Sequence, residues 1–197
     1  MIRFMTKQEL REIYQNHMMN DFPDDERKPL SIIESRFMKN QTHCLVYLEE
    51  DVIKGYAILE SCQKSLLMDY FAVIESYRNQ GIGTKFLCEM KEYFREYDAL
   101  FVESECAYNE ISQKRLDFYQ KAGFEISGVQ VHLYHVDYEL MVLSLNPETE
   151  SLDVRRMMEE IYEKLYPNSF RMLFLKWKKR KCVEIVKSVI GQVTLLL

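Results

Sequence analysis

Residues 67–84 read LMDYFAVIESYRNQGIGT. The apolar and aromatic residues in the first half of this stretch predict a β-strand that ends at Val73. Beyond the two glycines, apolar residues recur at helical spacing and predict an amphipathic helix. Its apolar face comprises Phe86, Leu87, Met90, Phe94 and Tyr97. A strand, a turn with glycines and a helix in direct succession indicate an α/β fold.

The turn between this strand and this helix predicts a site for a pyrophosphate group. Gly81 and Gly83 have no side chains, so a phosphate can approach the backbone closely. The helix N-terminus offers unpaired N–H groups and the positive end of the helix dipole, and Arg78 adds a positive charge. A Walker loop is excluded because Gly-Lys-Ser/Thr is absent. A dinucleotide fingerprint is excluded because it would need a third glycine at Phe86.

The sequence on either side of this stretch predicts a mixed α/β sheet. Thr6 and Glu9 have the spacing of a capping box at the start of a first helix. A second helix is expected at 30–39, and a later one at 112–122 that stops at Gly123. Strands 42–48 and 52–59 are joined by a short polar turn and predict an antiparallel hairpin. Further strands are expected at 1–5, 66–73, 99–102, 124–126 and 138–145.

The composition is typical of a folded protein. Hydrophobic residues make up 47% and charged residues 29%, which excludes a disordered chain. No apolar run approaches the roughly 20 residues that span a bilayer, and the first residues lack the apolar segment of a signal peptide. The five cysteines include no C-x-x-C pair, which indicates reduced thiols. We therefore expect a cytoplasmic protein without a membrane partner. His132 and His135 have no further ligands at metal-binding spacing, so no metal is expected.

The distribution of charge divides the chain near residue 146. Residues 1–150 contain 16 Lys and Arg against 26 Asp and Glu, whereas residues 151–197 contain ten against five. We expect a main domain at 1–146 and a helix-plus-strand extension at 147–197. The helix of this extension carries an apolar stripe that must be buried against the same chain or a second copy. We favour the same chain for the helix and a homodimer for the protein as a whole. The stripe consists of Leu152, Met157, Ile161 and Leu165.

The end of the extension allows two interpretations. Residues 170–177 are rich in apolar and aromatic side chains and predict a strand that is suited to addition at a sheet edge. The basic run at 176–181 is compatible with binding to nucleic acid or anionic lipid, and equally with a solvated edge or turn. We favour the solvated edge and expect no nucleic-acid partner, because the main domain is acidic.

A second motif lies about 40 residues after the glycines. Residues 115–124 read RLDFYQKAGF, in which F-Y-x-K-x-G-F closes a helix and opens the next strand. Together with R-x-x-G-x-G at 78–83, this motif resembles the signature of the GNAT superfamily of N-acetyltransferases. The resemblance covers roughly residues 1–145 and points to an uncharacterised branch, because residues 102–105 and the loop at 22–27 also fit one. Residues 151–197 match nothing in the core pattern of the family.

The resemblance implies a fold and a cofactor. The fold would be a mixed, mostly antiparallel central sheet of about six or seven strands flanked by helices, in which two central strands splay apart around the pantetheine arm of acetyl-CoA. The backbone of one of these strands would pair with the arm, and the glycine turn would hold the pyrophosphate. A residue at the start of the later helix would also contact the cofactor. The implied cofactor-binding residues are Phe71, Ala72, Val73, Arg78, Asn79, Gln80, Gly81, Ile82, Gly83, Thr84 and Ser112.

The resemblance also implies a direct reaction, in which an amine attacks the thioester in a ternary complex. Tyr119 matches the tyrosine that protonates the leaving thiolate, and a phenol with a pKa of about 10 carries that proton at neutral pH. Glu103 is the candidate base. In the common pattern a glutamate stands twelve residues before the tyrosine, where this chain has Ala107. Glu105 or a water molecule therefore remains an alternative.

These features predict an enzyme that transfers the acetyl group of acetyl-CoA to a primary amine. The acceptor, a small molecule or a peptide, is not specified by the sequence. The alternative function is an acyl-CoA-binding sensor without efficient turnover. The presence of Tyr119 favours turnover over the sensor.

Overall fold

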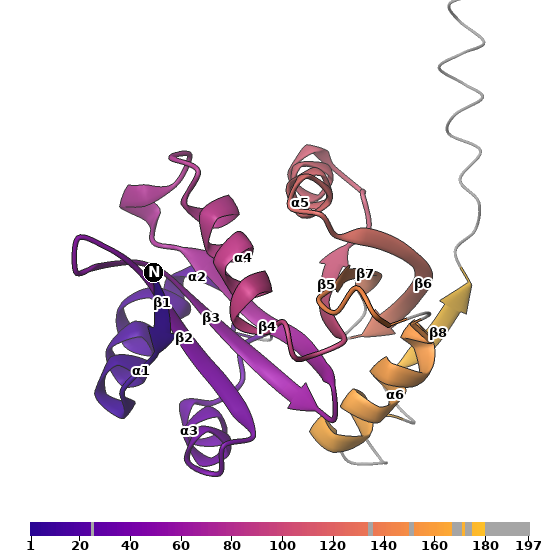
Figure 1. Ribbon diagram of the computed structural model, residues 1–197, viewed down its shortest axis with the longest axis horizontal. Coiled ribbons are helices and arrows are strands. Elements are labelled where there is room, and N and C mark those ends of the chain that lie inside the picture. Colours follow the sequence, from indigo (N-terminus) through magenta and orange to yellow (C-terminus); the bar gives the residue numbers. More distant parts are fainter. Residues whose placement is uncertain (25, 134–135, 150–151, 167–170, 172–174, 180–197) are drawn as a thin grey trace, which may run out of the picture.

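The computed structural model describes residues 1–179 except 25, 134–135, 150–151, 167–170 and 172–174. Its centre is an eight-stranded sheet in the order β1-β2-β3-β4-β5-β7-β6-β8, in which only β4 and β5 run parallel. Helices cover both faces of this sheet (Figure 1). The strands are β1 (Ile2–Phe4), β2 (Thr42–Glu49), β3 (Val52–Cys62), β4 (Ser65–Val73), β5 (Ala99–Glu105), β6 (Glu125–Leu133), β7 (Val136–Ser144) and β8 (Lys176–Lys179).

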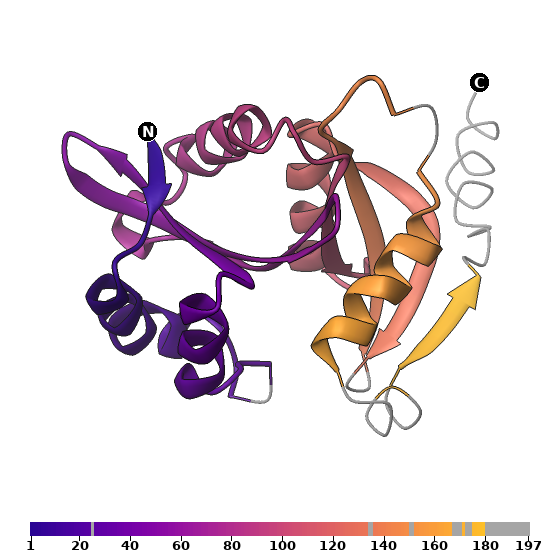
Figure 2. The same cartoon turned by 60° about the horizontal axis from the view of Figure 1, so that its bottom comes forward.

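The helices form two groups. In Figures 1 and 2, α4 and α5 lie on one face of the sheet, and α1, α3 and α6 lie on the other. Within the described residues, the helices are α1 (Lys7–Ile13), α2 (Met19–Asp21), α3 (Leu30–Met38), α4 (Ile82–Tyr93), α5 (Glu110–Lys121) and α6 (Val154–Leu165). None of these helices is long and apolar enough to span a membrane. The mixed sheet confirms the predicted fold, and the eighth strand comes from the C-terminal extension.

Local sequence explains most of the element boundaries. The capping box of Thr6 and Glu9 is formed at the start of α1. The β2–β3 hairpin turns at Glu50 and Asp51, both of which have positive φ and thus suit a two-residue turn. Gly123 adopts φ +95° just beyond α5, as expected for a glycine that ends a helix.

Three elements differ from the sequence-based expectation. A π-helical turn at Tyr14–Met18 follows α1, and its buried side chain is that of Met18. β6 extends to Leu133, well beyond the expected 124–126. The sequence pattern ends early because the register with β7 shifts near Gly128, which interrupts the alternation of apolar residues. The strand expected at 170–177 is β8 at Lys176–Lys179, and the rest of that segment lies largely outside the described residues.

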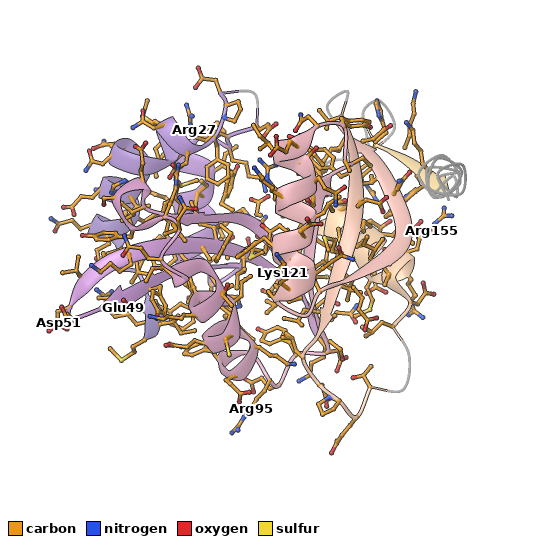
Figure 3. The ribbon with its side chains drawn as sticks, turned by 90° about the horizontal axis from the view of Figure 1, so that it is seen from above. Arg27, Glu49, Asp51, Arg95, Lys121 and Arg155 are labelled. Atoms are coloured by element: carbon orange, nitrogen blue, oxygen red, sulfur yellow. The ribbon has the colours of Figure 1, made fainter. Side chains whose placement is uncertain are left out.

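The C-terminal extension is built into the same sheet. α6 buries Met158, Ile161 and Tyr162 against apolar side chains of β4 to β7. β8 pairs antiparallel with β6 at the edge of the sheet. Figure 3 shows Arg155 on the side of the molecule formed by α6 and β8, where its guanidinium lies 5.4 Å from the ring centroid of Trp177. The described part of the extension therefore packs on its own chain, as expected for the helix, and part of the basic run is an edge strand.

The most important feature for the site is the short junction between β4 and β5. The two strands pair only from Ser65–Leu67 to Ala99–Phe101, although each continues for several residues beyond this. After the junction, β4 remains paired with β3 and β5 with β7. Beyond the junction, one edge of each central strand therefore has no neighbouring strand in the part of the chain that the structure describes.

Candidate active site

The turn before α4 is shaped for a phosphate group. Asn79 has φ +61° and Gly81 has φ +76°, so two residues of this turn adopt the left-handed conformation. Gly81 is the N-cap of α4, and the first helical hydrogen bond runs from Lys85 N to Gly81 O at 3.1 Å. The N–H groups of Ile82, Gly83 and Thr84 precede that bond and have no acceptor within the helix. They point out of the helix N-terminus, the position where anions bind.

Arg78 is held beside this turn. Its Nε donates to Val73 O at 3.0 Å, and its Nη2 lies 2.5 Å from Asp21 Oδ1. Asp21 is fixed in turn by Tyr56, whose hydroxyl donates to the other carboxylate oxygen at 2.7 Å. The Arg78 side chain remains 45% exposed, so its charge is available to a ligand at the turn.

Gly83 has a packing role as well. A Cβ atom built at Gly83 would lie 3.1 Å from the ring of Phe118 on α5 and 3.5 Å from Val73. The absence of a side chain therefore lets the first turn of α4 approach α5. The Phe118 ring also stacks on Phe71 of β4, with centroids 6.2 Å apart.

The free edge of β4 offers backbone groups to a ligand. Ile74 N donates to Lys54 O, and backbone groups of alternate residues point to the same side of a strand. By this alternation, the backbone groups of Ala72 face β3, whereas those of Phe71 and Val73 face the side that β5 has left. Contact of Val73 O with Arg78, not with β3, agrees with this direction.

The other face of the sheet carries buried charged groups at the same level. The β3–β4 register skips Asp69, which forms a β-bulge, and its Oδ2 lies 2.6 Å from Lys28 Nζ. Burial lowers the pKa of Lys28, but Asp69 and Glu60 raise it by more, so the ammonium keeps its charge. Glu60 is 3% exposed and receives Nη2 of Arg36 at 2.7 Å and the hydroxyl of Thr42 at 2.8 Å.

Glu103 is the third carboxyl group on this face. Its Oε1 accepts a hydrogen bond from the hydroxyl of Tyr162 on α6. Burial raises the pKa of Glu103 to about 7, and repulsion from Asp69 adds to the rise, whereas the Tyr162 bond and Lys28 oppose it. No cation among the described residues forms an ion pair with it. Glu103 is thus a carboxyl whose protonation changes near neutral pH, at the point where β5 has left β4.

Tyr119 lies on the opposite face. Its ring is 7% exposed and packs within the cluster formed by α4, α5 and the sheet, with Phe124 at 5.4 Å between centroids. Burial raises the pKa of its phenol to about 12, so the proton is retained at neutral pH. Ser112 is occupied otherwise, since its Oγ accepts from the backbone N–H groups of Tyr108 and Asn109 in the cap of α5.

The glutamate alternatives have different partners. Glu105 is half-buried and lies 3.7 Å from Arg115 of α5, and Ala107 is exposed in the bend that follows β5. The structure adds three residues that the sequence analysis did not place together: Lys28, Asp69 and Tyr162. They lie far apart in the chain, and no local spacing signals that they meet.

The comparisons with known proteins agree with this arrangement. Residues 40–126 match the family model for the acetyltransferase (GNAT) domain. No curated protein matches the sequence significantly. One similar structure is a protein from Bacteroides thetaiotaomicron assigned to the GNAT family, with a TM-score of 0.66, 18% identity, and coverage of 86% of this chain and 98% of that one.

Two further structures share the fold. One is the ribosomal-protein-S18-alanine N-acetyltransferase of Escherichia coli, with a TM-score of 0.61, 17% identity and coverage of 77% of this chain and 97% of that one. The other is a spermidine N-acetyltransferase chimera from Vibrio cholerae, with a TM-score of 0.59, 13% identity and coverage of 74% and 96%. The family model thus matches residues 40–126, and the chain as a whole has the fold of these acetyltransferase structures.

Proposed function

We propose that the protein transfers the acetyl group of acetyl-CoA to a primary amine by direct attack in a ternary complex. The observation that carries this proposal is the separation of β4 from β5, with Glu103 on one face of the sheet and Tyr119 on the other. Direct transfer needs a base on the side of the amine and an acid on the side of the thiolate. A thioester lying between the two strands would have both.

The cofactor is expected on the face of α4 and α5. The turn at 78–84 would hold the pyrophosphate through free N–H groups and the charge of Arg78. The backbone of Phe71 and Val73 would pair with the pantetheine arm as an added strand would. Ser112 would act indirectly, because its hydroxyl caps α5 and thereby fixes the loop before it.

The reaction then follows from the two ionisable groups. Glu103 in its ionised form would remove a proton from the acceptor's ammonium group, directly or through water, to give the neutral amine that attacks, and its pKa of about 7 suits that task at neutral pH. The amine nitrogen forms a bond to the carbonyl carbon, and the carbon–sulfur bond breaks. Tyr119 would give its proton to the departing thiolate.

The acceptor is expected to be cationic before it reacts. Glu103 lies beside a cluster of ion pairs in which Asp69 and Glu60 face Lys28 and Arg36. Together with Glu103, this cluster has three carboxyl groups and two cations. Two structural neighbours act, by their names, on a ribosomal protein alanine and on spermidine. Both acceptors are amines, and both serve as first probes for this protein.

The test is an acetyl-transfer assay read by the thiol released from acetyl-CoA. The amine panel contains spermidine, free lysine and a short peptide with an N-terminal alanine. We expect turnover with at least one class of amine, and a loss of roughly 10²–10⁴-fold in kcat for Glu103→Gln. Glu105→Gln is the matched control on the same strand and should keep most of the rate.

The same assay separates the proposed function from its alternative. If acetyl-CoA binds by calorimetry but no amine in a wide panel releases thiol, the proposal is wrong and a sensor is favoured. If Glu105→Gln loses the rate and Glu103→Gln does not, transfer stands but the base is assigned to the wrong residue.

A further inference from the structure

The helix of the C-terminal extension reaches the candidate base. α6 (Val154–Leu165) is preceded by its N-cap Asp153, whose side chain accepts a hydrogen bond from Arg156 N at 3.1 Å. Its inner face is buried, with Ile161 and Tyr162 each 1% exposed. The same helix packs against β3, β4 and β6, so it crosses the sheet beside the β4–β5 junction.

Tyr162 is held rigidly at this point. Its ring lies 5.7 Å from that of Trp177 on β8 and 6.0 Å from that of Tyr166, the residue that ends α6, measured between centroids. A buried ring in contact with two others has little freedom to rotate. The direction of its hydroxyl is therefore set by α6 and β8, and that hydroxyl donates to Glu103 Oε1.

The other groups around Glu103 do not replace this hydrogen bond. Asp69 of β4 is paired with Lys28 of the loop before α3. Tyr138 of β7 is close enough to feel the charge of Glu103. Burial raises the pKa of the Tyr138 phenol, and the Glu103 carboxylate adds to that rise. Among the described residues, Tyr162 is the only side chain that donates a hydrogen bond to Glu103.

We propose that Tyr162 is a positioning residue for acetyl transfer, because its hydroxyl fixes the Glu103 carboxyl at the place where β4 and β5 separate. This inference rests on the proposed function. It makes the extension part of the catalytic apparatus, although the sequence motifs of the family lie entirely before it. The acceptor would approach a carboxyl whose orientation is set by the last helix and strand described.

The hydrogen bond has a measurable consequence for the charge of Glu103. Burial and Asp69 raise the pKa of Glu103, whereas the Tyr162 bond and Lys28 lower it. Without the Tyr162 hydrogen bond, burial and Asp69 still raise the pKa of Glu103, and only Lys28 still lowers it. The pKa should therefore rise, and Glu103 should ionise only at a higher pH.

The experiment titrates Glu103 directly in the full chain with ¹³C-labelled glutamate, and the Glu103 signal is assigned by its loss in Glu103→Gln. Tyr162→Phe keeps the ring and removes only the donor. We expect the apparent pKa of Glu103 to rise by about one unit, the effect of one lost hydrogen bond to an ionised group. Tyr47→Phe is the matched control, because Tyr47 is a buried tyrosine whose hydroxyl donates to Glu49 at 3.1 Å, away from Glu103.

A second substitution protects the test against loss of folding. 3-Fluorotyrosine at position 162 keeps the hydrogen bond and makes the hydroxyl a more acidic donor, so the pKa of Glu103 should fall. Opposite shifts in the two variants support the proposal. An unchanged Glu103 titration in either folded variant overturns it.

The rate of transfer distinguishes this inference from the function on which it rests. With spermidine or the alanine peptide as acceptor, the acid limb of kcat/KM should move to higher pH in Tyr162→Phe by the same amount as the titration. Acetyl-CoA affinity should not change. If the titration moves and the acid limb does not, Tyr162 still sets the state of Glu103, but Glu103 is not the base and the proposed mechanism fails instead.

Discussion

The two faces of the sheet differ in the kinds of side chains that they carry. The face under α4 and α5 is an apolar cluster with a glycine turn at its end, and its key positions lie within two short segments, 71–84 and 112–124. The face under α3 and α6 carries ion pairs and a hydrogen-bonded glutamate, and its key residues stand at 28, 69, 103 and 162. The proposed cofactor site depends on the backbone geometry of short segments, whereas the proposed acceptor site combines side chains that lie far apart in the sequence.

The largest effect is expected from a substitution in the glycine turn of the first face. Gly83→Glu would place a carboxylate where the phosphate approaches and would also push against Phe118, so acetyl-CoA binding should fall below detection by calorimetry. Gly128→Glu is the control for the added carboxylate, since Gly128 lies in β6, away from the turn, with open space around it; its positive φ, which Gly83 lacks, affects only the local backbone. Equal acetyl-CoA affinities in the Gly83 variant and the parent chain would contradict the assignment of the turn.

The second prediction concerns the acid on the same face. Tyr119→Phe removes the hydroxyl but keeps the packed ring, so kcat should drop by roughly 10²–10⁴-fold with little change in acetyl-CoA affinity. Tyr93→Phe, which removes an exposed hydroxyl from α4, should leave kcat unchanged. A Tyr119 variant with the full rate would reduce Tyr119 to a core residue.

The third prediction concerns the apolar floor of the second face. Ile161 is 1% exposed, and its truncation to alanine should cost about 2–5 kcal/mol in the free energy of unfolding, measured with denaturant. Ile111→Ala, at a side chain that is 71% exposed, should stay within about 0.5 kcal/mol of the parent. If truncation of Ile161 costs as little unfolding free energy as truncation of Ile111, α6 does not pack on the sheet in solution.

The smallest expected effect is a dependence of stability on pH. Glu103 has a pKa of about 7 when folded against 4.5 as its ordinary value, so the folded state holds more protons between these pH values. Its contribution to stability therefore falls as the pH rises through this window. Glu103→Gln should melt higher than the parent at pH 8, and the difference should shrink towards pH 4.5. Glu110→Gln, at an exposed carboxyl, should show no such trend.

The sequence was informative where structure depends on neighbouring residues. The hairpin, the capping box of Thr6, the stop at Gly123 and the strand–turn–helix at 67–84 all depend on contacts within a few positions, and each is found as expected. The π-helical turn after α1 was missed because a shift of one residue in helical register leaves the hydrophobic pattern nearly the same. β6 was cut short because the irregularity at Gly128 interrupts its alternation.

The candidate site divides in the same way. The phosphate turn and Tyr119 were located by motif, and their roles remain predictions. The surroundings of Glu103 were not predictable, because its hydrogen bond to Tyr162 joins residues 59 positions apart in the chain. The bulge at Asp69 was equally hidden, since the alternation of β4 cannot be phased without knowing which residue the register skips.

The narrow β4–β5 junction has a consequence for how the chain is completed during synthesis. Only three residue pairs join the two halves of the sheet, and the cluster that spans them includes side chains of β3, β4, β5 and α6. Each half can form its own hairpins early, but the cluster remains open until α6 has left the ribosome. Until α6 has been synthesised, this cluster lacks Met158, Ile161 and Tyr162, and the carboxyl of Glu103 lacks the hydroxyl that orients it.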